Sequence, residues 1–596
     1  MKCLPPEIRR FVGPLMLFFI TACAEDSQWS LKHRYENPYK KILLEKDRVS
    51  LHRIVIRSYH NALERNDVIG AAKINALFAG EACARSRRVL DFWMTEADAE
   101  THLFPTDLTT DKRIWTTRNA AADLFPFLVI AAHFLNETHL PSLYKALASE
   151  QALSGALARS VDLHKNAVYK EKTSSVIFGA SEYCKDGLLP ITERLGNNLF
   201  TARMVEIIDA IFERADFTTD YGLLPSTQAE VNGEMLQVLC RLYWMTGNEK
   251  YRTWARRIGD FYLLEAIPKN NFLPPYDVNP DIKASRKERC KLRDHGNEII
   301  PGLAELYFLE AVTKGDRERF YYEPLKTMLD KLLAIGRNEH GMWYYALNVA
   351  TEKPEKNRIC DNWGYLYSAY ETFALACEQA HPHDPAISHR YREAIRQTLA
   401  NLKHYTSFDW GDLHQDGYAD SIESALYMLN RFPSHAGFAW VDDEIQTLFA
   451  KQAPQGFVDA TYLDGNYIRT LLLYAFLKTQ GTYIKPWRED VLFGAHRDGE
   501  KLYLYLETAL PWSGKLCFDV PRHREVFNLP VNYPRVNEWP EWFVVHEKKE
   551  YIITDLASRE TKIVSGTQLR EGIMVELKNA ASVNLKIEPK EYLTTY

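Results

Sequence analysis

Two carboxylates and a histidine stand together in the stretch 293–301, directly before a run of apolar residues. Pro301 is tolerated in the first turn of a helix but not in its interior, so the sequence predicts a helix that begins near residue 298. The unpaired amide groups and the dipole at a helix start favour negative charge. Glu298 is therefore a candidate proton donor or acceptor, and His295 a candidate general base or partner for a hydroxyl group. The alternative is a helix cap with satisfied polar neighbours.

A further carboxylate, Asp361, precedes two aromatic residues at another predicted helix start. Trp363 and Tyr365 follow it closely, and their rings could stack on a sugar. A carboxylate at each of two neighbouring helix starts can supply one acid and one base, so Glu298 and Asp361 form the first candidate catalytic pair. The alternative for Asp361 is an N-cap on the helix that follows it.

Polar residues recur at predicted helix starts at intervals of roughly 45–65 residues, longer than most solenoid repeats. Arg118 could bind a substrate carboxylate, or form a salt bridge to Asp123. Asp420 and Glu423 could contact substrate, but they also have the spacing of a capping box. The substrate-binding candidates are Trp363 and Tyr365 together with Arg118, Asn119, Glu230, Glu234, Asp420, Glu423 and Asn466.

Helical periodicity extends from about residue 50 to about residue 480, interrupted by loops that contain Gly, Pro and Asp. Apolar helices with polar starts alternate with more polar helices, which predicts two layers with the polar starts gathered at one end. The predicted helices include 82–95, 124–135, 202–215, 234–245, 251–264, 321–335, 365–377, 387–402, 422–429 and 468–477.

Over roughly residues 75–480 this pattern resembles the six-hairpin glycosidase superfamily, and the resemblance is one of architecture rather than of a signature motif. It implies a mostly α fold, an (α/α) toroid in which the loops before the inner helices form a sugar site. Seven polar helix starts can be counted instead of six, so the expected toroid is (α/α)6-7, occupying residues 51–485. An open α-solenoid that binds protein is the structural alternative.

The hydrophobic periodicity of the sequence changes from helical to strand-like after Pro486. Residues 486–596 are therefore expected to form a β-sandwich. The stretches 501–506, 575–577 and 583–587 alternate with the two-residue period of strands. Between them, the segment 512–543 is dense in Trp, Arg and His. Such residues are common interface anchors, so this segment is expected to join the two domains; covering the mouth of the toroid is the alternative.

The first 23 residues have the pattern of a bacterial lipoprotein signal peptide. Lys2, Arg9 and Arg10 precede a short apolar run that ends at Thr21-Ala22-Cys23. Lipidation of Cys23 would anchor an exported protein to a bacterial membrane, on its periplasmic or surface face, without a spanning helix. An uncleaved anchor or a lipid-free secreted form is the alternative. The polar residues 24–50 are expected to form a tether.

Composition and motifs exclude several classes of function. The net charge of −6 argues against a nucleic-acid partner. No P-loop, dinucleotide fingerprint or zinc-protease motif is present, so neither a cofactor nor a metal is expected. Paired carboxylates in a toroid favour a glycoside hydrolase. Arginines and a histidine near the helix starts, Arg118, His295, Arg358 and Arg469, suggest an acidic, uronate-containing glycan.

Two other functions remain open at this stage. A polysaccharide lyase would use His295 or a tyrosine to abstract a proton beside a uronate carboxylate. A lipoprotein that binds glycan without cleaving it is the third hypothesis, although a binder has little reason to gather mutually repelling acids.

Overall fold

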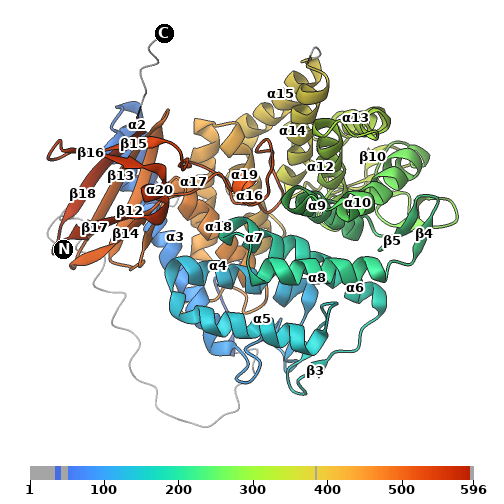
Figure 1. Ribbon diagram of the computed structural model, residues 1–596, viewed down its shortest axis with the longest axis horizontal. Coiled ribbons are helices and arrows are strands. Elements are labelled where there is room, and N and C mark those ends of the chain that lie inside the picture. The colour runs from blue at the N-terminus through green and yellow to red at the C-terminus, as the bar shows by residue number, and fades with distance from the viewer. Residues whose placement is uncertain (1–33, 42–50, 383–384, 591–596) are drawn as a thin grey trace.

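The computed structural model describes residues 34–41, 51–382 and 385–590, and its helices form a closed double ring beside a small β domain (Figure 1). Seven inner segments can be traced within these residues, and each is followed or preceded by an outer helix. The fold is therefore an (α/α) toroid with seven hairpins, at the upper limit of the prediction.

The inner segments carry the polar starts. They are η2 (Thr117–Leu124) with α4 (Phe125–Leu135), α6 (Thr173–Glu182) with η4 (Tyr183–Leu188) and α7 (Leu189–Leu195), α9 (Ala229–Thr246), α12 (Ile299–Val312), α14 (Trp363–Ala380), α16 (Gln415–Arg431) and α18 (Asp464–Lys478). The outer helices are α3 (Val68–Glu96), α5 (Leu140–Ser154), α8 (Leu199–Glu213), α10 (Glu249–Phe261), α13 (Glu318–Ile335), α15 (Ala386–Asn401) and α17 (His435–Ala450).

Neighbouring inner helices contact one another all the way round. The contacts run from α4 to α7, α6 to α9, and on through α12, α14, α16 and α18, which packs back against α4. The seventh hairpin joins the two ends of the toroid sequence, because the outer helix beside α18 is the early helix α3. An open solenoid would leave its first and last helices apart, so that alternative is wrong.

The division into inner and outer helices follows from the distribution of apolar residues along each helix. Helix α12 is apolar on every side and almost wholly buried, as expected of a helix enclosed by others. Outer helix α10 buries only one face, which includes Tyr251, Ala255 and Ile258. Helices α9 and α12 approach closely at Gly233, where a Cβ atom would lie 2.3 Å from the carbonyl carbon of Glu298. Any larger residue at position 233 would push apart two helix starts that carry candidate site residues.

The C-terminal domain is a two-sheet β structure, as predicted. All strand pairs of this domain are antiparallel, and Leu502, Leu504 and Leu506 point into its core. One sheet has the order β11 (Tyr483–Lys485), β14 (Trp512–Cys517), β17 (Ile573–Leu577). The other has the order β12 (Val491–Asp498), β13 (Lys501–Thr508), β18 (Ser582–Pro589), β15 (Glu550–Asp555), β16 (Thr561–Ser565). Strands β12 and β13 pack on α3, which ties the domain to the toroid.

The segment 519–545 leaves the β domain and enters the toroid from the end opposite the polar helix starts; we call it the plug. Its short helix α19 (Arg522–Glu525) lies among the toroid helices in Figure 1. The plug bonds to residues in the middle or at the far ends of inner helices, among them Arg431 near the end of α16 and Glu305 within α12. The predicted interdomain role of this region is confirmed, and the alternative position over the mouth is wrong.

Residues 34–41, expected to belong to a tether, pack against the toroid instead. Tyr35 is buried in the main core, and the Asn37 side chain donates to the carbonyl oxygens of Lys451 and Val458. Cys23 and the signal segment 1–23 lie outside the described residues and stay predictions. Among the residues that the structure describes, no helix is both long enough and apolar enough to cross a membrane.

Candidate active site

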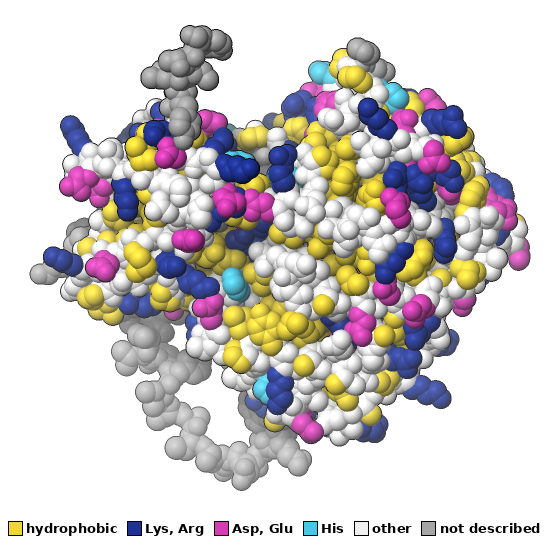
Figure 2. Space-filling view, viewed as in Figure 1, with side chains coloured by type: hydrophobic (Ala, Val, Ile, Leu, Met, Phe, Trp, Pro, Cys, Tyr) yellow, Lys and Arg dark blue, Asp and Glu magenta, His cyan; other side chains and the backbone are white. Residues whose placement is uncertain are grey.

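A pocket with an empty volume of about 700 Å³ opens among the starts of the inner helices, a size typical of small-molecule sites. Its lining is strongly acidic, whereas Figure 2 shows basic and acidic side chains interspersed on the outer face in view. The cationic lining residues are Arg118, Lys185, Arg469 and the histidine His295. The carboxylates that line the pocket are Asp123, Glu182, Asp186, Glu230, Asp294, Glu298, Asp416 and Asp420.

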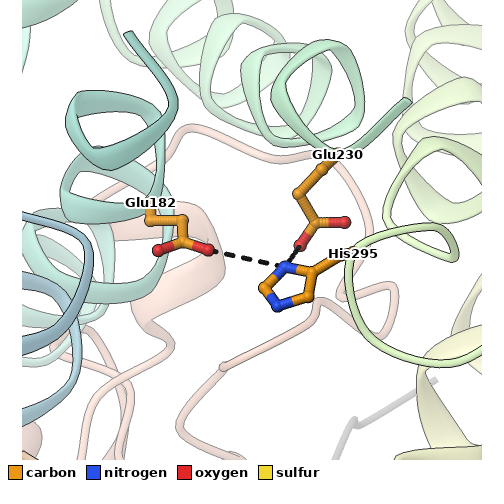
Figure 3. A group of neighbouring side chains, drawn as sticks. All are labelled: Glu182, Glu230 and His295. Atoms are coloured by element: carbon orange, nitrogen blue, oxygen red, sulfur yellow. Dashed lines mark ion pairs between the residues drawn. The ribbon is translucent and has the colours of Figure 1, made fainter. Parts of the chain in front are cut away.

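His295 lies between carboxylates from three segments of the chain. Its Nδ1 atom is 3.5 Å from Glu230 Oε1 and 3.7 Å from Glu182 Oε1, as Figure 3 shows, and its Nε2 atom is 3.4 Å from Asp294 Oδ2. The backbone places the ring there through a left-handed conformation at His295, with φ of 64°. The charge of Asp294 raises the pKa of His295 to about 9, so the imidazole is protonated at neutral pH.

The two carboxylates on opposite sides of His295 have pKa values shifted in opposite directions. Burial raises the pKa of Glu230 to about 7. Burial would also raise the pKa of Asp294, but the positive charges of His295 and Arg293 outweigh it and lower the pKa below its ordinary value. Near neutral pH the pocket thus holds one carboxyl group able to donate a proton beside one that is ionised.

Glu182, Glu230 and His295 also meet the geometric requirement for holding a metal ion, since their ligand atoms lie within 4.8 Å of one another. Two carboxylates and an imidazole are ligands that Zn²⁺ or Mn²⁺ accepts. Binding there would first require His295 to lose its proton.

Glu298, the first catalytic candidate from sequence, lies in the pocket wall within an ion-pair network. Its Oε1 atom accepts from Lys185 Nζ at 2.9 Å, and its Oε2 atom accepts from Gln237 at 2.6 Å. Lys185 also donates to Asp186 at 2.7 Å. Buried donors therefore occupy both oxygens of Glu298. A carboxylate bound in this way is better suited to orienting Lys185 than to donating a proton.

Asn537 of the plug lies behind the pocket wall and bonds to two of its lining residues. Its side-chain amide donates to Asp186, and its oxygen accepts from the Tyr365 hydroxyl at 3.2 Å. Asn537 is almost wholly buried and adopts φ of 60°, a conformation that asparagine tolerates better than most residues. The C-terminal domain therefore holds two lining residues in place from behind the pocket wall.

We expect Asn537→Ala to lower kcat by about tenfold, because Asp186 and Tyr365 each lose a buried hydrogen bond. Steady-state kinetics on any substrate that the protein turns over would measure the loss. Asn528→Ala is a matched control, since Asn528 also has a positive φ of 56° in the plug but is exposed and bonds only to backbone oxygens of Trp244 and Met245. Equal kinetic losses in both variants would show that the effect is one of backbone strain.

Several residues predicted from sequence lie in the pocket wall. They lie at the starts of six inner segments, which shows that the polar helix starts do converge. These residues are Arg118, Asn119, Glu230, His295, Glu298, Tyr365, Asp420 and Asn466. Their catalytic and binding roles stay predictions.

Four other predicted residues do not line the pocket. Both oxygens of Asp361 accept from Arg293, at 2.7 and 2.9 Å. Trp363 is fully buried, with its indole nitrogen donating to Ser421, so it cannot stack on a sugar. Glu423 is buried and bound by Arg469. Glu234 is fully buried behind Glu230 rather than in the wall.

The candidate list drawn from sequence omitted several lining carboxylates. Asp123 and Asp186 were visible in a repeat, because each precedes apolar residues and a proline as Glu298 does. That repeat marks inner segments whose start faces the pocket. Asp294 and Asp416 had no comparable signal, since a charged loop residue next to a helix is ordinary. Their place in the wall depends on tertiary packing.

An outer pocket continues from the inner one towards solvent, with aromatic side chains that the sequence did not single out. Phe178 and Tyr276 line it together with Gln228. Arg118 lies at the junction of the two pockets, is exposed, and has no carboxylate partner among the described residues. The predicted salt bridge from Arg118 to Asp123 is therefore absent, and the guanidinium group is available to a ligand.

No family model matches the sequence, and no curated protein does so either. Solved structures found to be similar include a cellobiose 2-epimerase from Bacillus thermoamylovorans, with 13% identity, coverage of 59% of this chain and 88% of that chain, and a TM-score of 0.37. A possible member of the GH105 family from Salmonella enterica has 14% identity, coverage of 56% and 93%, and a TM-score of 0.37. The GH76A α-1,6-mannanase from a Salegentibacter species has 7% identity, coverage of 66% and 98%, and a TM-score of 0.37.

At this level of similarity these structures say nothing about the reaction of this chain. The predicted (α/α) toroid is confirmed by the chain itself, which folds as a closed double ring of helices. The ring has seven hairpins rather than six.

Proposed function

We propose that this protein is a glycoside hydrolase that uses Glu230 as general acid and Asp294 as the ionised carboxylate. The observation that carries the proposal is the opposite shift of their pKa values on the two sides of His295. A protonated carboxyl can donate to the leaving oxygen of a glycosidic bond, while an ionised one activates water or attacks the sugar carbon. Protonated His295 holds the pair in place and stabilises the ionised member.

The charge of the inner pocket favours a neutral sugar there. Eight carboxylates outnumber the cations among its lining residues, and Arg469 is already bound by Glu423. A uronate in the inner pocket would also find its other cations engaged, because Lys185 is bound by Asp186 and Glu298 and His295 lies between Asp294 and Glu230. The acidic glycan suggested by the sequence is thus not supported for this subsite, and Arg118 at the junction with the outer pocket is the lining cation best placed for an anionic group.

The plug supports cleavage at a chain end. Asn537 and its neighbours close the pocket from below, so a long glycan has no exit through the toroid. A terminal sugar can enter the inner pocket while the rest of the chain lies in the outer pocket, beside Phe178 and Tyr276. Aromatic rings are suitable partners for the apolar faces of sugars.

The two other functions considered from sequence have less support. A lyase must neutralise a uronate carboxylate beside the abstracted proton, and the acidic lining of the inner pocket opposes that. The Tyr365 hydroxyl already donates to Asn537, and burial raises its pKa well above the ordinary value, so it is a poor base. A pure binding protein would gain nothing from the costly burial of the carboxyl groups of Glu230 and Glu182.

A panel of neutral and uronate-bearing oligosaccharides, incubated with the full chain and followed by chromatography with ultraviolet detection, tests the proposal. We expect release of a saturated neutral monosaccharide from a chain end. An ultraviolet-absorbing product would establish a lyase, and conversion of a sugar into an isomer without cleavage would establish proton transfer at carbon. Binding without any product would favour the non-catalytic protein.

A further inference from the structure

A second cleft, separate from the acidic pocket, lies on the small sheet formed by β8 (Arg289–Lys291), β9 (Ala346–Asn348) and β10 (Lys353–Pro354). It has an empty volume of about 560 Å³. Antiparallel pairing of the three strands gives it a rigid base. Its lining residues are Arg289, Tyr345, Ala346, Glu355, Lys356 and Arg358.

Positive charge surrounds the Tyr345 ring in this cleft. The guanidinium carbon of Arg358 lies 5.3 Å from the ring centroid, and that of Arg289 lies 5.9 Å from it. Lys291 Nζ and the guanidinium carbon of Arg293 are 5.7 and 5.9 Å away. Four cations around one aromatic ring repel one another, and a bound anion would relieve that repulsion.

Nearby carboxylates neutralise only part of this charge, since Asp361 accepts from Arg293 and Asp412 Oδ2 lies 3.8 Å from Arg358 Nη2. Glu355, the acidic residue among those that line the cleft, pairs with Arg289 at 2.9 Å. Lys291 and Lys356 have no carboxylate partner in the part of the chain that the structure describes. The Nε atom of Arg289 is buried and has no hydrogen-bond partner. The cleft therefore keeps an excess of positive charge and at least one unused donor.

Lys291 connects this cleft to the outer pocket. Its Nζ atom lies 5.5 Å from the centroid of the Tyr276 ring, which lines the outer pocket, and 5.7 Å from the centroid of Tyr345. A glycan leaving the outer pocket past Tyr276 would next meet the cationic cleft. Lys291 thus lies between a lining ring of the outer pocket and the central ring of the cleft.

We propose that the cleft on β8–β9–β10 is a subsite for an anionic sugar of the substrate, one that bears a carboxylate or a sulfate ester. Arginine side chains bind such groups through paired N–H donors, and Tyr345 offers a face for the sugar ring. The assignment of the cleft as a subsite rests on the proposed function, whereas the binding of an anionic glycan does not. The substrate is then a mixed glycan, with a neutral terminal sugar and an anionic residue further along.

Calorimetric titration with oligogalacturonate and with its fully methyl-esterified form tests the proposal, because the two ligands differ in charge while their sugar rings are the same. Using the full chain with Glu230→Gln avoids turnover during the measurement. We expect the charged form to bind, and we expect adding Lys356→Gln and Arg358→Gln to weaken it about tenfold or more, with little effect on the ester. Arg65→Gln, at an exposed position after α2 (Leu51–Glu64), is the matched control.

Other outcomes decide the matter as clearly. Equal affinity for the charged and esterified forms, or no change in the cleft variants, would overturn the proposal. So would the absence of binding by both oligogalacturonate and a sulfated oligosaccharide. Binding of the sulfated ligand alone, again lost in the cleft variants, would assign the subsite to sulfate esters. Cleavage assays run in parallel report on the hydrolase proposal separately, since binding needs no turnover.

Discussion

We expect Glu230→Gln to lower kcat by about 10³-fold, within the range of general acid catalysis. Glutamine keeps the size and polarity of the side chain but cannot donate the proton that the leaving oxygen needs. The variant should fold normally, because it removes a group that is already neutral over much of the accessible pH range and makes no short hydrogen bond. Single-turnover and steady-state kinetics with the best substrate from the oligosaccharide panel would measure the loss.

The pH profile gives this prediction a second readout. Because burial raises the pKa of Glu230 to about 7, the acid is protonated below that pH, and activity should fall as pH rises through it. The pKa of Asp294 is below its ordinary value. Protonation of Asp294 should therefore reduce the activity only in strongly acidic solution. In Glu230→Gln the residual activity should lose its alkaline limb.

Glu234→Gln is the matched control for Glu230→Gln. Glu234 lies one turn further along α9, is fully buried and does not line the pocket, so its replacement should change kcat by less than about tenfold. If Glu230→Gln retains most of the activity, or if its alkaline limb is unchanged, Glu230 is not the acid. Glu182, the other carboxylate facing His295 Nδ1, would then be the next candidate.

The second large effect is expected on the free energy of unfolding, when the buried Arg535 is replaced. Arg535 of the plug is fully buried, and its Nη2 atom lies 2.9 Å from Glu193 Oε1 of α7 and 3.3 Å from Glu538 Oε2. Arg535→Met should destabilise the protein by about 3–5 kcal/mol, because it leaves the buried carboxylate of Glu193 without its cation, whereas Glu538 keeps Arg431. Urea unfolding followed by intrinsic tryptophan fluorescence would show the lower midpoint.

A double variant separates charge from packing. Adding Glu193→Gln to Arg535→Met removes the stranded charge, so most of the lost stability should return. Arg524→Met, at an exposed position of the same plug, should change stability little. If Arg535→Met lowers the free energy of unfolding no more than Arg524→Met does, the buried ion pairs do not hold the plug in the toroid.

The sequence by itself was enough to predict the main architecture. Apolar helices such as α12 alternate with amphipathic ones such as α10, and this local periodicity does not depend on distant contacts. The two-residue alternation of β13 marked the C-terminal β domain for the same reason. Pro301 in the first turn of α12 placed that helix start, and with it His295 and Glu298 came within reach of the pocket.

Only the tertiary structure decided which of these residues face the pocket and which serve the core. Asp361 and Glu298 looked equivalent in sequence, but Arg293 binds both oxygens of Asp361 outside the wall, while Glu298 faces Lys185 within it. Such choices depend on side chains that are far apart in the chain and meet only when the ring closes. Asn537 is the clearest case, because it comes from another domain to bind Asp186 and Tyr365 of the pocket wall. Periodicity can place a residue on its helix, but contact across a closed ring is set by the packing of all seven hairpins.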